Sequence, residues 1–146
     1  MRAVPFPRIA PLFLAAGLGL VSAAAAEPVV IVHPDSGVQS LTRDDVINIF
    51  MGRQKRLPSG IVALPVEQAR PATTRARFYQ LLVKKVLPDI SAYWARLLYS
   101  GQAQPPRQAE RAEEVLELVS QNRGAIGMVD GARADRRVRV VFDLGR

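Results

Sequence analysis

The sequence predicts one α/β domain, with a mostly parallel β-sheet and helices on both of its faces. Two observations lead to this class. Short apolar runs alternate along the chain with segments whose apolar residues repeat at helical spacing. The first run, Val29–Val32, is apolar and β-branched throughout. Such a run is typical of a strand that is covered on both faces, as in a parallel sheet.

The N-terminus has the pattern of a secretory signal. Arg2 and Arg8 supply positive charge, and an apolar stretch at Ile9–Val21 leads to small residues that end at Ala26. We expect cleavage after Ala26, which leaves 146 − 26 = 120 residues for a single domain, residues 27–146. This predicts a periplasmic protein. An uncleaved N-terminal anchor is the alternative, although no later segment is apolar enough to span a membrane.

The chain is basic and has no cysteine. Its net charge is +7, and removal of Arg2 and Arg8 leaves 20 − 2 = 18 basic against 13 acidic residues, or +5. Without cysteine there is neither a disulfide framework nor lipid attachment through a cysteine. A basic exported domain can meet anionic lipid or small anions. Nucleic acid is not an expected partner, because no aromatic-rich basic segment is present.

A turn and a capped helix follow the first strand. Pro34 ends the strand, because proline has no amide hydrogen to donate. Thr42 and Asp45 have the spacing of a capping box, which predicts that a helix begins there. We expect Gly52 to close this helix in the left-handed conformation.

The next strand and helix lead to the candidate site. Ile61–Val66 is an apolar run that predicts a parallel strand, and Pro65 places this strand near an edge of the sheet. Glu67–Ala72 is the loop at its carboxyl end. Thr73 or Thr74 then caps the helix that follows.

The remainder of the chain alternates helices with strands. We expect helices at Pro88–Ser100 and Ala109–Gln121, an extended linker with two prolines at Gln102–Gln108, and strands at Ala125–Val129 and Val138–Phe142. The apolar side of the second of these helices consists of Ala112, Val115, Leu116 and Val119. The aromatic residues of the first are interpreted as core residues rather than as a platform for a ligand: Tyr93, Trp94 and Tyr99.

Four segments resemble a known family. Ser40–Arg53 resembles the Leu-Ser/Thr-x-x-x-Ile-x-x-Ile-Phe-x-Gly segment of the phosphate-binding proteins of ABC transporters, and Asn122–Val129 resembles their Pro/Asn-Gly-Ala-Ile-Gly-Tyr-Val strand. Ile61–Val66 and Ala72–Thr74 fall where that family has the strand that leads to the ligand loop and the start of the next helix. The order of the segments agrees over most of Val29–Phe142. The resemblance implies a type II periplasmic binding protein fold.

Two departures from the family pattern limit what the resemblance implies. Phosphate-clamping members have two lobes, whereas this chain has length for only one, similar to the lobe reached after the first chain crossover. Where the family has Ser-Gly before the helix, this chain has Pro71 and Ala72, so at least one backbone donor to an anion is lost. The resemblance therefore implies descent and fold more firmly than tight phosphate binding, as in a small single-lobe relative.

The start of the helix at Thr73 is the candidate anion site. Free N–H groups and the helix dipole attract anions at such a position, and Thr73 and Thr74 add hydroxyl donors. Three arginines lie close by in the sequence, namely Arg70, Arg75 and Arg77. Cations are unfavourable at a helix start, so their presence suggests an anion nearby, and arginine offers phosphate or carboxylate two hydrogen bonds. The alternative is a threonine cap with solvated arginines.

Further donors are expected from the ends of other strands. Ligands of open α/β sheets bind beyond the carboxyl ends of the strands. This rule brings Ser36 and Gln68 toward Thr73, together with Asp130, which is otherwise an ordinary turn residue.

Catalytic and metal sites are not predicted. His33 is the only histidine and, beside Pro34, is interpreted as a structural residue. Ser36 alone does not make a nucleophile and base pair. The sequence has no Cys/His cluster suited to zinc and no acidic loop with calcium spacing. We therefore expect no enzyme, no cofactor and no metal.

The preferred interpretation is a periplasmic, non-catalytic protein that binds phosphate or a similar oxyanion, as the substrate-binding component of an ABC transporter does. Binding should be weak, because one lobe cannot enclose the ligand. The expected partners are the anion and an ABC permease, a sensor or a protein that supplies the second lobe. The alternative is an accessory module for protein interaction or sensing that has lost tight ligand binding. Pro71 and Ala72 favour this alternative, and the arginines oppose it.

Overall fold

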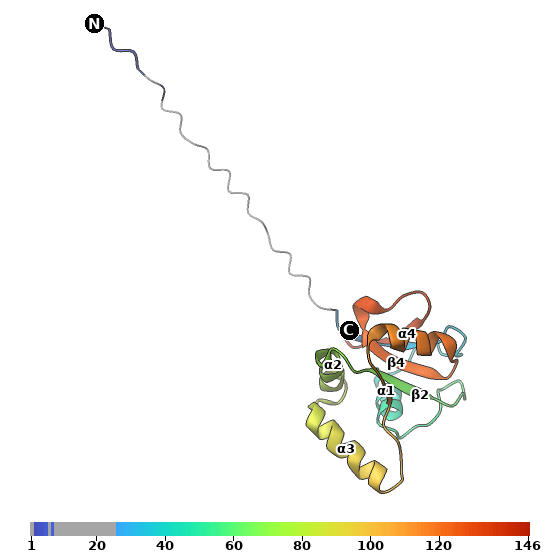
Figure 1. The fold of residues 1–146 in the computed structure, drawn as a ribbon. Coiled ribbons are helices and arrows are strands. Elements are labelled where there is room, and N and C mark those ends of the chain that lie inside the picture. Colours follow the sequence, from blue (N-terminus) through green and yellow to red (C-terminus); the bar gives the residue numbers. More distant parts are fainter. Residues whose placement is uncertain (1, 6, 8–25) are drawn as a thin grey trace.

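The computed structural model describes residues 2–5, 7 and 26–146. The apolar part of the predicted signal and most of its cleavage motif lie outside the described residues. From residue 26 onward, one five-stranded sheet carries helices on both faces (Figure 1), which confirms the α/β class. In chain order the elements are β1 (Pro28–Val32), α1 (Arg43–Phe50), β2 (Leu64–Gln68), α2 (Ala72–Val83), α3 (Leu87–Tyr99), β3 (Arg107–Ala109), α4 (Ala112–Gln121), β4 (Ala125–Asp130), the 3-10 turn η1 (Gly131–Arg133) and β5 (Arg139–Asp143).

The sheet is mixed, with the strand order β3-β2-β4-β1-β5. β2 runs parallel to β3 and β4, whereas β1 runs antiparallel to both of its neighbours, β4 and β5. β1 lies inside the sheet between β4 and β5 and is fully buried, as its apolar sequence predicts, but it runs antiparallel to the other four strands. The expectation that β1 is a parallel strand is therefore wrong. An uninterrupted apolar run indicates that both faces of a strand are buried, but it does not indicate whether the strand runs parallel or antiparallel to its neighbours.

Two apolar cores lie on the two faces of the sheet. On one face, α4 covers Ile31 and Val66 with the four residues that the sequence assigns to its apolar side, Ala112, Val115, Leu116 and Val119. On the other face, α1, α2 and α3 cover Val30 and Met128. Gly127 allows the close approach of α4, because a Cβ atom there would lie 2.7 Å from Cγ1 of Val115. No helix in the described part of the chain is both long enough and apolar enough to cross a membrane.

The middle of the chain differs from the sequence prediction. β2 begins at Leu64 instead of 61 and continues through Gln68. It is the second strand from the edge of the sheet, so the expectation that Pro65 places it near an edge is confirmed. The amide of Leu64 donates to the carbonyl of Gly124 beside β4 at 2.9 Å. The backbone nitrogen of Pro65 therefore points toward the side of β2 where β3 lies. Because β3 begins only opposite Val66, no β-sheet hydrogen bond is lost through the missing N–H of Pro65.

The boundaries around α3 and α4 also differ. The predicted linker 102–108 contains the start of β3, so α4 begins at Ala112 and not at Ala109. In α3, Trp94 is buried as expected, and the hydroxyl of Tyr93 donates to the carbonyl of Met51 at 2.6 Å. Tyr99 is 98% exposed, so its interpretation as a core residue is wrong. It occupies the last turn of α3, beyond Ile90 and Trp94, the buried residues of this helix.

The predicted capping box opens α1. The hydroxyl of Thr42 accepts from the amide of Asp45 at 3.1 Å, and the Asp45 carboxylate accepts from the amide of Thr42 at 3.0 Å. Gly52 follows the helix with a φ of +76°, as expected.

Replacing Thr42 with alanine should lower the free energy of unfolding by about 1 kcal/mol, because the amide of Asp45 loses its acceptor. Urea denaturation measures this change. Thr42→Ser keeps the hydroxyl and serves as the control. Equal losses in the two variants would contradict the capping role of the hydroxyl.

Candidate functional site

The carboxyl ends of β2 and β4 meet beside the start of α2, since the two strands are parallel neighbours. Gln68 connects them. Its Oε1 atom accepts from the amide of Asp130 at 3.2 Å, and its Nε2 atom donates to the carbonyl of Arg70 at 3.0 Å. Its side chain is therefore engaged within the protein, and the residue is only 2% exposed. As predicted, Gln68 and Asp130 come to this end of the sheet, but Gln68 is buried and holds the loop in place through these two hydrogen bonds.

Helix α2 begins one residue before the threonines. Its first residue is Ala72, Pro71 occupies the N-cap, and no side chain caps the helix. The prediction that Thr73 or Thr74 is the cap is wrong, because both lie inside the first turn. The amide of Thr74 donates to the carbonyl of Pro71 at 3.1 Å. The amides before it have no intrahelical acceptor, as at every helix start, and the threonine hydroxyls stand beside them.

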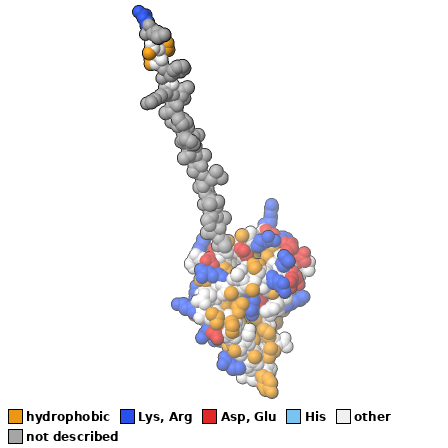
Figure 2. Space-filling model, turned by 60° about the vertical axis from the view of Figure 1, so that its left-hand side comes forward, with side chains coloured by type: hydrophobic (Ala, Val, Ile, Leu, Met, Phe, Trp, Pro, Cys, Tyr) orange, Lys and Arg blue, Asp and Glu red, His pale blue; other side chains and the backbone are white. Residues whose placement is uncertain are grey.

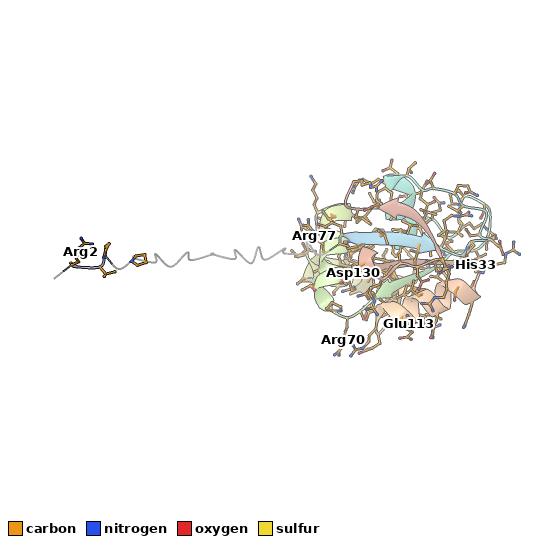
Figure 3. All side chains as sticks on the ribbon, turned by 90° about the horizontal axis from the view of Figure 1, so that it is seen from above. Arg2, His33, Arg70, Arg77, Glu113 and Asp130 are labelled. Carbon is orange, nitrogen blue, oxygen red and sulfur yellow. The ribbon has the colours of Figure 1, made fainter. Side chains whose placement is uncertain are left out.

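A shallow depression of about 360 Å³ lies at the start of α2. Its lining is Ala26, Glu27, Pro28, Pro71, Thr73, Thr74, Arg77 and Asp130. Figure 3 shows Arg77 and Asp130 together at one end of β1. The depression thus combines hydroxyl donors and a guanidinium with two carboxylates, from Glu27 and Asp130.

Each arginine near the helix start has a carboxylate partner of its own. Arg70 pairs with Glu110 at 3.1 Å on the surface. Arg77 pairs with both oxygens of Glu27 at 2.8 Å. This hydrogen bonding lowers the pKa of the Glu27 carboxyl and raises the pKa of Arg77. Arg75 is paired as well, with Glu67. The sequence suggested an anion nearby because these three arginines looked unpaired, and the structure shows that they are paired.

Arg75 belongs to a buried network around Glu67. From the sequence, Glu67 was expected to lie in a loop. Glu67 is 1% exposed and ends β2 beside Gln68. Its carboxylate accepts from Nε of Arg75 at 2.6 Å, from the hydroxyl of Tyr79 at 2.6 Å and from Nε2 of Gln108 at 3.0 Å. Burial, and then the charge of Glu67, raises the pKa of Tyr79 well above its ordinary value. Three donors satisfy this buried charge, so Arg75 is held inside the domain.

Sequence reasoning missed the network, although two signals point to it. Glu67 directly follows the apolar residue Val66, and a charge at the end of a buried strand needs a partner. Arg75 and Tyr79 are four residues apart, which places them on one face of a helix. No comparable signal indicates Gln108, which reaches Glu67 from the neighbouring strand β3.

Ser36 and His33 lie at the opposite end of the sheet. Because β1 is antiparallel to β4, its carboxyl end lies where β4 begins, with Val32 opposite Ile126. Figure 3 shows His33 at the far end of β1 from Arg77. The prediction that Ser36 approaches Thr73 is wrong for this reason. Ser36 is buried, and its hydroxyl accepts from the amide of Val38 at 3.2 Å. Nδ1 of His33 accepts from the amide of Asp35 at 2.9 Å, a local structural contact.

Solved structures of several larger proteins share this fold. A putative phosphate ABC transporter substrate-binding protein with bound phosphate, from Clostridium perfringens, aligns with a TM-score of 0.61 and 18% identity over 81% of this chain and 45% of that chain. An ABC-type phosphate transport receptor from Vibrio cholerae gives a TM-score of 0.62 and 17% identity over 81% and 46%. A possible phosphate binding protein from Planctomyces limnophilus gives 0.55 and 11% over 75% and 37%.

The chain spans less than half the length of each of these proteins. No protein-family model matches the sequence, and no curated protein matches it. The likeness therefore concerns the fold. The domain from residue 26 onward has the α/β fold of one part of proteins described as phosphate-binding components of ABC transporters.

Proposed function

We propose that residues 27–146 form an exported, non-catalytic recognition domain of the solute-binding type, which contacts phosphate or a similar oxyanion weakly at the start of α2. The observation that carries this proposal is the depression in which Thr73, Thr74 and Arg77 lie together at a helix N-terminus. Such a position favours negative charge and offers donors to it. An ABC permease or a sensor is the proposed protein partner, by analogy with the transport proteins that share the fold.

The same geometry makes the contact weak. An anion must displace Glu27 from Arg77, and Asp130 adds a second negative charge to the lining. The exchange is feasible because the side chains of Arg77 and Glu27 are 51% and 33% exposed, and exposed ion pairs contribute little. Water competes for an open site that no second lobe covers. Arg70 and Arg75 can contact the anion only if it displaces their carboxylate partners, Glu110 and Glu67, as well.

Calorimetric titration of the protein with phosphate, with sulfate and chloride for comparison, tests the proposal. We expect saturable heat at millimolar phosphate. Thr73→Val combined with Thr74→Val removes two hydroxyl donors at nearly constant shape and should abolish the heat. Arg123→Gln, which removes one exposed charge beside the opposite end of β4, should leave it unchanged. Equal heats in the wild type and in the double valine variant would contradict the proposed site.

A second candidate function is protein interaction without a small-molecule ligand. The pairing of Arg70, Arg75 and Arg77 with carboxylates of the same chain favours it, because none of these three arginines is left unpaired at the start of α2. Absence of heat with phosphate up to tens of millimolar would support this second candidate against the first.

A further inference from the structure

A larger groove lies at the other end of β2, away from the start of α2. It has a volume of about 670 Å³ and lies between the last turns of α3 and the segment 101–107 that leads to β3. We call it the α3 groove and define it by six of its lining residues, Gly52, Lys55, Leu64, Trp94, Leu98 and Arg107. Its volume falls in the range that small-molecule sites occupy.

The groove exists because the sheet is incomplete at this point. β3 covers β2 only from Val66 onward, so the outer side of Leu64 is left without a strand partner. The chain leaves α3 through Gly101, which has a φ of +70°. Gly52 forms part of the floor, where a Cβ atom would lie 2.8 Å from the ring of Trp94.

The charges around the α3 groove have one sign. Lys55 and Arg107 line it and are exposed, and no aspartate or glutamate is among its lining residues. Within residues 26–146, neither Lys55 nor Arg107 forms an ion pair. The α2 depression differs in this respect, since its arginine is already neutralised. An occupant with an acidic group would complement the α3 groove.

Trp94 forms part of the wall of the groove and is 5% exposed. A Cβ atom on Gly52 would lie 2.8 Å from Cη2 and 3.2 Å from Cζ3 of its ring. The apolar edge of the indole therefore lies beside Gly52 at the groove.

The rim of the groove is apolar. Leu98 is 51% exposed and Val62, which also lines the groove, is 60% exposed. Figure 2 shows hydrophobic side chains gathered at the lower end of the molecule, the end that α3 forms in Figure 1. Exposed apolar side chains around a cavity mark a place where apolar surface is covered by a ligand.

We propose that the α3 groove binds a small free amphiphile, with its apolar chain against Trp94 and Leu98 and its acidic head between Lys55 and Arg107. Both features are needed to match the lining, since an uncharged chain leaves the two cations unpaired and a small inorganic anion leaves the apolar rim exposed. The site is separate from the proposed oxyanion contact, so phosphate does not compete for it.

Trp94 is the only tryptophan of the chain, so its fluorescence reports on the groove directly. The test titrates the protein with monomeric decanoate, with decyltrimethylammonium as a probe of equal chain length and opposite charge. We expect a saturable spectral change with decanoate alone. Lys55→Gln combined with Arg107→Gln should weaken it by about tenfold or more, the loss expected for a charge-assisted hydrogen bond. Arg133→Gln with Arg136→Gln removes two charges elsewhere and should have no effect.

Other outcomes would overturn the proposal. Equal responses to decanoate and decyltrimethylammonium would show adsorption without charge recognition. A response to phosphatidylglycerol vesicles in the absence of any response to monomeric decanoate would indicate a membrane surface as the occupant. Ala103→Leu narrows the groove near Gly52 and Trp94 and should prevent the decanoate response. Its circular dichroism shows whether the variant is folded, and a folded Ala103→Leu that binds decanoate normally would place the ligand elsewhere.

Discussion

Replacing Glu67 with alanine is expected to destabilise the domain by about 3–5 kcal/mol, the range for removal of one partner from a buried ion pair. The side chains of Glu67 and Arg75 are 2% and 15% exposed. Without the carboxylate, the guanidinium of Arg75 and the hydroxyl of Tyr79 lose their acceptor at a site that water barely reaches. Urea denaturation followed by circular dichroism measures the loss as a lower midpoint at an unchanged slope.

The surface pair Arg70–Glu110 provides a matched control. Its side chains are 72% and 61% exposed, so Glu110→Ala should change the free energy of unfolding by about 0–1 kcal/mol. Glu67→Leu combined with Arg75→Leu removes both buried charges and should recover much of the loss seen with Glu67→Ala. A Glu67→Ala variant no less stable than Glu110→Ala would contradict the buried network.

Phe78→Ala is expected to cost about 3–5 kcal/mol, because it opens a cavity in the core between α1, α2 and the sheet. Phe78 is fully buried, and its ring makes edge contacts with Phe50 of α1 at 5.0 Å and with Tyr79 at 5.1 Å between centroids. The loss should appear in urea denaturation and in thermal unfolding. It should also loosen the position of α2, which carries the candidate oxyanion contact.

Tyr99→Ala serves as the control for this variant, since it removes an aromatic ring that is 98% exposed. It should change the free energy of unfolding by no more than about 0.5 kcal/mol. Comparable losses in Phe78→Ala and Tyr99→Ala would mean that α2 does not pack on the sheet as described.

The features that the sequence predicts well are local. The capping box at Thr42 and Asp45 and the apolar side of α4 depend on residues within a few positions of one another, and the structure has both. The direction of β1 is different, because it depends on strands that come almost a hundred residues later. The short strand β3 could not be predicted from the sequence for a similar reason. Its polar sequence, Arg-Gln-Ala, lacks a strand pattern, and it pairs because β2 offers it an open edge.

The candidate site illustrates the same limit. The sequence places Thr73, Thr74 and the arginines near one helix start, and the structure agrees with that placement. What the sequence does not indicate is how the arginines are paired. Glu27 precedes Arg77 by fifty positions, and Gln108 reaches Glu67 across forty-one. Charges that look uncompensated along the chain are compensated by residues that only the fold brings near.

The position of β1 between the last two strands has a consequence for the order in which the domain forms. β1 is the first strand of the domain in sequence, yet its only strand partners are β4 and β5, the last two. β1 has no strand to pair with until the segments that form β4 and β5 are present. A partial chain that lacks these segments therefore leaves an apolar strand with unpaired amides. Loss of the last few residues would remove one side of that strand and reopen the core on both faces.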